Sequence, residues 1–333
     1  MAGHRKYDLL EAISQSINDC GWNVLYVEDT SSHPFLIKIY KEEKSYLLRI
    51  YIWNLTHGGG AARPRDEYRI QITGVNEFEQ RENEITLILG WWKDVGVFAG
   101  FDFHKHQGRL GFSPSIQIRE EYLRKALING FAPCDKGNHE IAIAFRPDFF
   151  VTYVQNITQL HSFGDSTNDF QILTDITENQ LEVNNSALGA VNTFRQTTLI
   201  QVSKKLRDNS FKARVLNAYG NKCAFSGMQL KLVDAAHILP VSYEGSTDDT
   251  FNGIALSALF HRAYDKGLVT FNQNYQIVLN EHELNKFGEI GFDGGLVEFR
   301  SLIRPIIFVP PAINDRPNIE FVTRANRLRG WKF

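Results

Sequence analysis

The chain has 333 residues, of which 43% are apolar and 22% charged, and its formal net charge is −2. This composition is typical of a globular protein with two domains, and it excludes a globally basic protein, so any nucleic-acid site must be a local basic patch. The N-terminus lacks the apolar core of a signal peptide, and no apolar run of about 18 residues occurs. We therefore expect a cytoplasmic protein with no membrane partner.

The cysteines disfavour both a disulfide framework and a four-cysteine zinc site. The chain has only Cys20, Cys134 and Cys223, which lie far apart and form no C-x-x-C pair. Cys223 is expected to be a small buried hydrophobic residue.

The first 160 residues predict a mixed α/β domain that is rich in antiparallel sheet. Apolar residues at helical spacing predict a helix in residues 1–20, which Gly21 can end. Runs of β-branched and aromatic residues predict strands at 22–27, 35–40 and 46–53, with a hairpin at 41–44 that joins the last two. Later elements are expected as strands at 84–90, 95–103, 115–118 and 140–145, and a helix near 119–129.

A stretch rich in glycine and arginine makes this domain a candidate reader of DNA. Glycine lets a backbone approach a phosphate closely, and arginine binds phosphates or guanine edges. The residues concerned are His57, the glycines 58–60, Arg63, Arg65 and Arg69. A second basic group comprises Lys93, His104, Lys105, His106 and Arg109. The alternative is a solvated hairpin loop, and we favour the contact with DNA for the glycine–arginine stretch.

Residues 161–195 are polar and are predicted to form a linker with one or two short helices. This linker would separate a DNA-recognition domain (1–160) from a second domain (196–333). The second domain opens with a basic helical segment in which Lys204, Lys205 and Arg207 could contact DNA phosphates. A merely solvated helix face explains the same residues equally well.

The most informative stretch runs from residue 223 to residue 271. His237 stands in an apolar run just before Leu239-Pro240, which predicts a strand that ends at the proline. A turn-rich loop at 243–251 follows and leads to Asn252. From Gly253 to Tyr264 the apolar spacing fits a short helix, and this helix would carry His261.

A strand, a loop and a helix with His, Asn and His at these places resemble the HNH nuclease motif, the ββα-metal fold. The agreement extends to Asn252-Gly253 and to the run 264–268, which resemble a restriction-endonuclease-like bacterial branch of the family. The resemblance covers residues 205–333, whereas residues 1–160 resemble no family that we can name. It implies that His237 is the general base, that Asn252 braces the loop, and that His261 binds the metal.

One position departs from the common pattern, in which a metal ligand directly precedes the base. Here that position is Ala236. Asp234 is a candidate replacement, but side chains alternate along a strand, so it would point away from the face of His237. Asp265 follows His261 by four residues, shares its helix face and is the other candidate ligand.

The chemistry explains these residue types. Cutting a phosphodiester needs an activated water, and neutral imidazole is a suitable base near pH 7. A divalent metal ion supplies positive charge at the phosphate and at the leaving oxygen. Imidazole, carboxylate and water ligands suit Mg²⁺ or Mn²⁺, and they also admit Zn²⁺.

We therefore expect an α+β protein with a C-terminal HNH ββα-metal nuclease domain. It would be a metal-dependent DNA endonuclease of a restriction or defence system, with site or modified-base choice left to the N-terminal domain. Double-stranded DNA is the expected partner, and two cuts per duplex favour a homodimer. Ala236 favours the alternative, a non-catalytic DNA-binding protein with a vestigial HNH fold. Glu42 and Lys44 form the end of a PD-(D/E)xK pattern, but no upstream aspartate accompanies them, so a second nuclease site is disfavoured.

Overall fold

The computed structural model divides the chain into two compact units, Met1–Leu206 and Arg207–Phe333. It describes residues 6–28, 31–58, 64–179, 188–189, 191–230 and 232–332. The boundary between the units falls inside the 26-residue helix α6 (Thr193–Ala218). Each unit has its own apolar core, and the two halves of α6 contribute to different cores.

In the described part of the chain, the N-terminal unit holds a nine-stranded sheet with the order β1-β2-β3-β5-β6-β9-β8, and β4 pairs with β3 and β7. Strands β3 and β5 run parallel, and the other pairs run antiparallel. The strands are β1 (Asn23–Tyr26), β2 (Phe35–Lys41), β3 (Lys44–His57), β4 (Glu67–Gln71), β5 (Glu84–Trp92), β6 (Val97–Phe101), β7 (Ser115–Arg119), β8 (Phe131–Gly137) and β9 (Glu140–Phe145). The expected sheet-rich α+β fold is confirmed.

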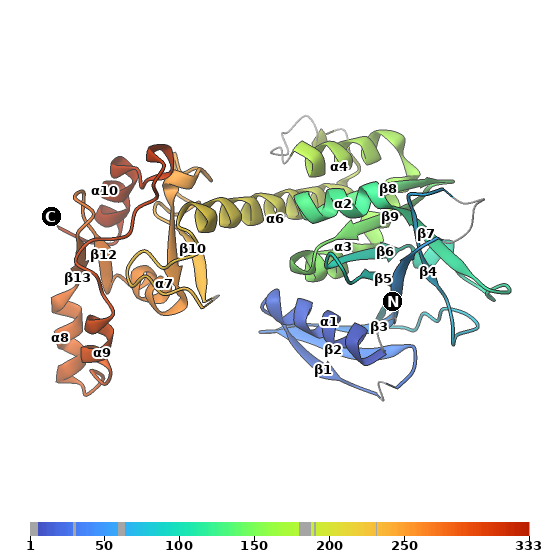
Figure 1. Cartoon of the computed structure of the whole chain (residues 1–333), viewed down its shortest axis with the longest axis horizontal. Coiled ribbons are helices and arrows are strands. Elements are labelled where there is room, and N and C mark those ends of the chain that lie inside the picture. The colour runs from blue at the N-terminus through green and yellow to red at the C-terminus, as the bar shows by residue number, and fades with distance from the viewer. Residues whose placement is uncertain are drawn as a thin grey trace. The chain divides into compact units, whose positions relative to one another are not determined.

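Side chains of β3 alternate between two buried layers, as the two-residue period of a strand requires. Ile50 and Ile52 face the core beneath α1, α3 and the first half of α6, whereas Tyr51 and Trp53 face the core beneath α2. Figure 1 shows α2 and α4 beside β8 and β9. The helices of this unit are α1 (Lys6–Asp19), α2 (Glu120–Asn129), α3 (Phe150–Ser162) and α4 (Thr167–Asn179).

Strand β8 is not among the strands expected from the sequence. Proline and glycine are typical of turns and loops, and β8 contains Pro133 and ends at Gly137. Among the described strands it pairs only with β9, so proline is tolerated at this sheet edge.

The segment 161–195, expected to be a linker with one or two short helices, carries helix α4. Leu173 and Ile176 of α4 are buried in the N-terminal core. Helix α4 therefore packs on the N-terminal unit, because a narrow apolar stripe is enough to dock an otherwise polar helix. Residues 180–187 and 190 of the same segment lie outside the described residues.

The C-terminal unit consists of two small antiparallel sheets with helices packed around them. Its strands pair as β10 (Val233–His237) with β11 (Gly253–Ser257) and β12 (Val269–Phe271) with β13 (Ile277–Leu279). Its helices after α6 are α7 (Ala258–Asp265), α8 (Glu281–Glu289), α9 (Leu296–Ser301) and α10 (Ile319–Leu328).

The prediction of a helix from Gly253 to Tyr264 is wrong in its first part, because that part is strand β11. Ile254, Ala255 and Leu256 are all buried, and a short continuous apolar run fits a buried strand as well as a helix. Pairing with β10 decides for the strand. The order strand, strand, helix is that of a ββα unit. None of the helices in the described ranges is long and apolar enough to cross a membrane.

Candidate active site

His237 ends strand β10 and is held on two sides. Its ring stacks on Phe211 of α6, with 3.8 Å between centroids and 7° between planes. Its Nε2 lies 2.9 Å from Oδ1 of Asp248, in the loop between β10 and β11. An ionised carboxylate can only accept a hydrogen bond, so in the neutral imidazole this contact requires the proton on Nε2 and leaves the lone pair on Nδ1.

Gly253 lies directly opposite His237 in the β10–β11 pair and lets α6 approach. A Cβ at this position would lie 2.1 Å from Cγ2 of Val215 and 3.1 Å from the ring of Phe211. Its φ of −114° is open to any residue, so the close approach alone requires glycine. Gly253 therefore permits the stack of Phe211 on His237.

Asn252 is fully buried and ties the end of β10 to the loop that carries Asp248. Its Oδ1 accepts a hydrogen bond from Leu239 N at 2.9 Å. Its Nδ2 donates to Thr247 O at 2.8 Å and to Leu239 O and Ser246 Oγ, both at 3.1 Å. Because both ends of the amide are used, a residue without this donor and acceptor would leave buried backbone groups unpaired.

Arg329, just after α10, links the end of β10 to α7. Its Nη1 donates to Ile238 O at 3.1 Å and to the hydroxyl of Tyr264 at 3.3 Å, and its guanidinium lies 4.3 Å from that ring centroid. Burial raises the pKa of Tyr264, while the nearby Arg329 lowers it in part. The basic C-terminal segment therefore positions the helix that follows the two strands.

Helix α7 turns Phe260, Ala263 and Tyr264 into the core and leaves His261 partly exposed. Nε2 of His261 lies 3.6 Å from Oδ2 of Asp265, four residues later on the same face. An imidazole and a carboxylate thus stand together within reach of solvent. These donor types fit a divalent metal ion whose remaining ligands are water.

Asp234 has a different neighbour. Its Oδ1 lies 2.8 Å from Nζ of Lys212 on α6, and both side chains are about half exposed, so the pair contributes little stability. Ala236, between Asp234 and His237, is buried in the core. Among the residues that the structure describes, no group of three or more His, Cys, Asp or Glu side chains could hold a metal ion.

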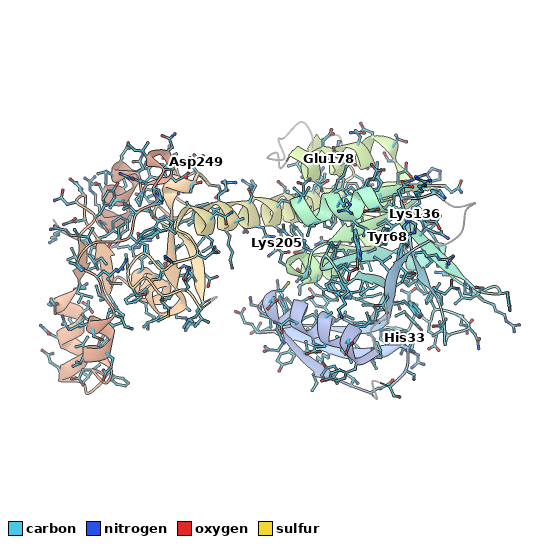
Figure 2. All side chains as sticks on the ribbon, in the orientation of Figure 1. His33, Tyr68, Lys136, Glu178, Lys205 and Asp249 are labelled. Carbon is cyan, nitrogen blue, oxygen red and sulfur yellow. The ribbon has the colours of Figure 1, made fainter. Side chains whose placement is uncertain are left out.

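The candidate DNA contacts of the N-terminal unit are partly brought together. His57 ends β3, its Nε2 contacts the carbonyl of Arg65, and its ring meets the ring of Tyr68 edge-on at 5.7 Å (Tyr68 is labelled in Figure 2). Arg65 is exposed and Arg69 on β4 is half-buried. Arg63 and the glycines 59–60 lie outside the described residues.

The basic residues expected on a helix lie on α6. Lys204 is exposed, and Arg207 is half-buried. Lys205 is also half-buried, and its Nζ lies 5.9 Å from the centroid of the Phe149 ring (Lys205 is labelled in Figure 2). Lys204 is thus the most accessible of the three to a phosphate. Glu42, of the disfavoured second nuclease pattern, sits in the turn between β2 and β3 with a φ of 52°.

Sequence reasoning missed the roles of Phe211, Asp248 and Arg329 around the site. Phe211 and Arg329 lie outside the stretch 223–271, so the spacing of its residues gives no signal for either. Asp248 stands beside Asp249 in the turn-rich loop, and nothing in the spacing distinguishes the two. A carboxylate between the His and the Asn of the motif was the available signal.

Comparisons with known proteins give matches in both units. Residues 223–272 match the family model of the HNH endonucleases, and residues 46–154 match a family model described as methylase-associated X1. No curated protein matches the chain. A solved structure titled "Modification dependent TagI restriction endonuclease" matches with 9% identity and a TM-score of 0.30, over 83% of this chain and 80% of that chain.

Proposed function

We propose, from the premise that residues 223–272 form an HNH endonuclease domain, that this chain is a metal-dependent nuclease of a restriction or defence system. The resemblance of the C-terminal unit to the HNH family is confirmed by this match. The observation that carries the proposal is the imidazole of His237, held by Phe211 and Asp248 beside a loop that Asn252 braces. The substrate is double-stranded DNA.

His237 acts as the general base. Asp248 keeps the proton on Nε2, so Nδ1 takes the proton from the attacking water. The stack on Phe211 limits rotation of the ring, which keeps that lone pair aimed in one direction. Asn252 and Arg329 act on the reaction only by positioning, since they hold the loop and the end of β10.

His261 and Asp265 would hold the divalent ion, which is Mg²⁺ or Mn²⁺, with Zn²⁺ as a further candidate. When bound, the ion supplies positive charge to the scissile phosphate and to the leaving oxygen. Asp265 is favoured over Asp234 as the carboxylate ligand, because it lies beside His261 whereas Asp234 lies beside Lys212.

The N-terminal unit chooses where the DNA is cut. Phosphate contacts position a protein without carrying sequence information, so a reader is needed beyond the nuclease motif. Exposed Arg65 and half-buried Arg69 are the candidate base contacts, and exposed Lys204 is the candidate phosphate contact. The match to a methylase-associated family supports a choice that depends on base modification. A homodimer would place one nuclease site on each strand.

The test is digestion of supercoiled plasmid, prepared with and without base methylation, by the full chain in Mg²⁺, Mn²⁺ or Zn²⁺. We expect nicking and linearisation that depend on the ion and on the methylation state. Nicking and linearisation are both lost when a chelator is added. They are also lost in His237→Ala, although this variant still binds DNA. If the chain binds the plasmid and cuts neither form with any ion, the vestigial, non-catalytic alternative is correct.

Recognition is tested separately by binding to cognate and scrambled duplexes at two salt concentrations. Arg65→Ala or Arg69→Ala should weaken cognate binding by roughly 1–3 kcal/mol per lost base contact. Lys204→Ala is the matched control, since loss of a phosphate contact weakens both duplexes alike and reduces the salt dependence. Equal losses on both duplexes for the arginine variants would make the stretch a phosphate clamp.

A further inference from the structure

An arm of the N-terminal unit, residues 104–114, presents a phenylalanine to solvent near its C-terminal end. The arm connects the short 3-10 helix η1 (Phe103–Lys105) with strand β7. Phe112 near its end has a relative exposure of 105%, so its ring is as exposed as in an extended peptide. Single exposed apolar residues are common on loose surface loops, so the question is whether this loop is loose.

The residues on both sides of Phe112 are held in place. On one side, Leu110 N donates to Asn76 O at 2.8 Å, and the Leu110 side chain packs against the core beneath α2. On the other side, Ile72 N donates to Pro114 O at 3.0 Å, and Gln71 Nε2 donates to the same oxygen at 3.0 Å. Phe112 is therefore an exposed ring on an anchored support.

The base of the arm is anchored as well. His106 Nε2 lies 3.0 Å from Oε1 of Glu140, the residue at which strand β9 begins. The same carboxylate oxygen accepts a hydrogen bond from Lys136 of β8, which is labelled in Figure 2. At the start of the arm, His104 N donates to the buried Asp102 at 2.9 Å. These contacts fix the arm to the sheet at its root, its middle and its end.

The arm is slender and carries positive charge. A Cβ added at Gly108 or Gly111 would meet no heavy atom within 4 Å, so there is open space beside both glycines, although Leu110 between them packs on the core. Lys105 and Arg109 are exposed, and the arm contains no carboxylate, although Glu77 follows Asn76 in the neighbouring loop. A protein interface needs a broad apolar patch, whereas one exposed planar ring on an arm that also carries cations suits stacked bases and phosphates.

We propose that Phe112 is a wedge that inserts between adjacent base pairs of the DNA duplex. The inserted ring stacks on the exposed base face, while Arg109 and Lys105 contact the flanking phosphates. Partial unstacking lowers the cost of kinking the duplex or of turning a base outward, and it favours flexible pyrimidine–purine steps. The wedge rests on the proposed function in one respect, namely that the N-terminal unit binds duplex DNA.

The experiment measures binding of the full chain to a set of methylated and unmethylated duplexes, each with 2-aminopurine at one of the successive steps, in a chelator so that no cutting occurs. We expect the wild-type chain to raise the 2-aminopurine fluorescence at one step. Phe112→Ala should lose this signal and bind roughly 5- to 100-fold more weakly, whereas Phe112→Trp should retain the signal. Arg109→Ala is the control for charge and should weaken binding while the signal at saturation persists.

Phe292→Ala is the control for exposed apolar surface, because that ring is 76% exposed in the other unit. Phe292→Ala should change neither the affinity for DNA nor the 2-aminopurine signal. Thermal unfolding of Phe112→Ala should match that of the wild-type chain, since the exposed ring adds little to the core. If the wild-type chain binds and Phe112→Ala gives the same affinity and signal, the wedge alone is overturned. If the wild-type chain binds no duplex, the wedge and the proposed DNA-binding function fall together.

Discussion

The imidazole of His237 lies parallel to the phenyl ring of Phe211, with 3.8 Å between the ring centroids. The two residues come from different elements, since Phe211 belongs to α6 and His237 ends β10. Phe211 is buried, so its ring is itself fixed by the core. The helix that joins the two units therefore forms one wall of the candidate active site.

Replacing the aromatic ring of Phe211 should slow cleavage without abolishing DNA binding. Phe211→Leu keeps an apolar side chain but removes the flat surface, so the imidazole gains rotational freedom and the cleavage rate falls roughly 10-fold. Phe271→Leu is the matched control, because Phe271 is equally buried in the same core and packs against Phe225 instead. Both variants should lose about 1 kcal/mol of stability. Equal rates for the two variants would contradict a positioning role for Phe211.

Gly253→Ala should destabilise the C-terminal unit by about 1–3 kcal/mol, because the new methyl group overlaps Val215 Cγ2. The double variant with Val215→Ala removes the overlapping atom and should recover part of that loss. Denaturant unfolding of the two single variants and the double variant completes a double-mutant cycle. Additive losses would mean that the approach of α6 is not what requires glycine here.

Asp248→Asn should lower the cleavage rate by about 10- to 10³-fold, because the amide no longer fixes the proton on Nε2 of His237. Asp249→Asn is the matched control, as this adjacent carboxyl group is exposed. The role assigned to Asp248 is wrong if the two variants have the same rate.

His261→Ala and Asp265→Asn should each weaken binding of Mn²⁺ and raise the ion concentration that is needed for cleavage. Asp234→Asn should leave both unchanged, since its carboxylate lies against Lys212. Calorimetric titration with Mn²⁺ measures the binding directly, without reference to cleavage. A larger effect for Asp234→Asn than for Asp265→Asn would exchange the assignments of the two carboxylates.

The root of the Phe112 arm should be sensitive to acid. Burial raises the pKa of Glu140, but hydrogen bonds from His106 and Lys136 outweigh it and lower the pKa from 4.5 to about 2. A carboxyl group whose pKa is lower in the folded state stabilises the fold above its unfolded pKa, and this contribution fades as the pH falls.

The difference in unfolding free energy between the wild-type chain and Glu140→Gln should therefore be fully present at pH 5.5. It should shrink between about pH 4.5 and pH 2. Urea unfolding at several pH values measures it. A difference that stays constant over this range would show that the ion pairs of Glu140 contribute nothing measurable.

Local patterns in the sequence predicted the strands of the N-terminal sheet other than β4 and β8, and the chemistry of the C-terminal motif. The runs of β-branched and aromatic residues at 35–40 and 46–53, with the turn at 41–44 between them, predicted the β2–β3 hairpin. The spacing and identity of His237, Asn252 and His261 predicted an HNH motif, and the family match confirms it. The type of a side chain determines which chemical roles it can take, and this information is present in the sequence alone.

Only the tertiary structure decided which groups surround these residues. Asp248 rather than Asp249 contacts His237, because the hydrogen bonds of Asn252 shape the loop. Likewise, β11 is a strand and not a helix, because β10 lies beside it. Periodicity records which side of an element is buried, but not the partner that buries it. Partners distant in sequence are set by the packing of the whole unit, which no local pattern contains.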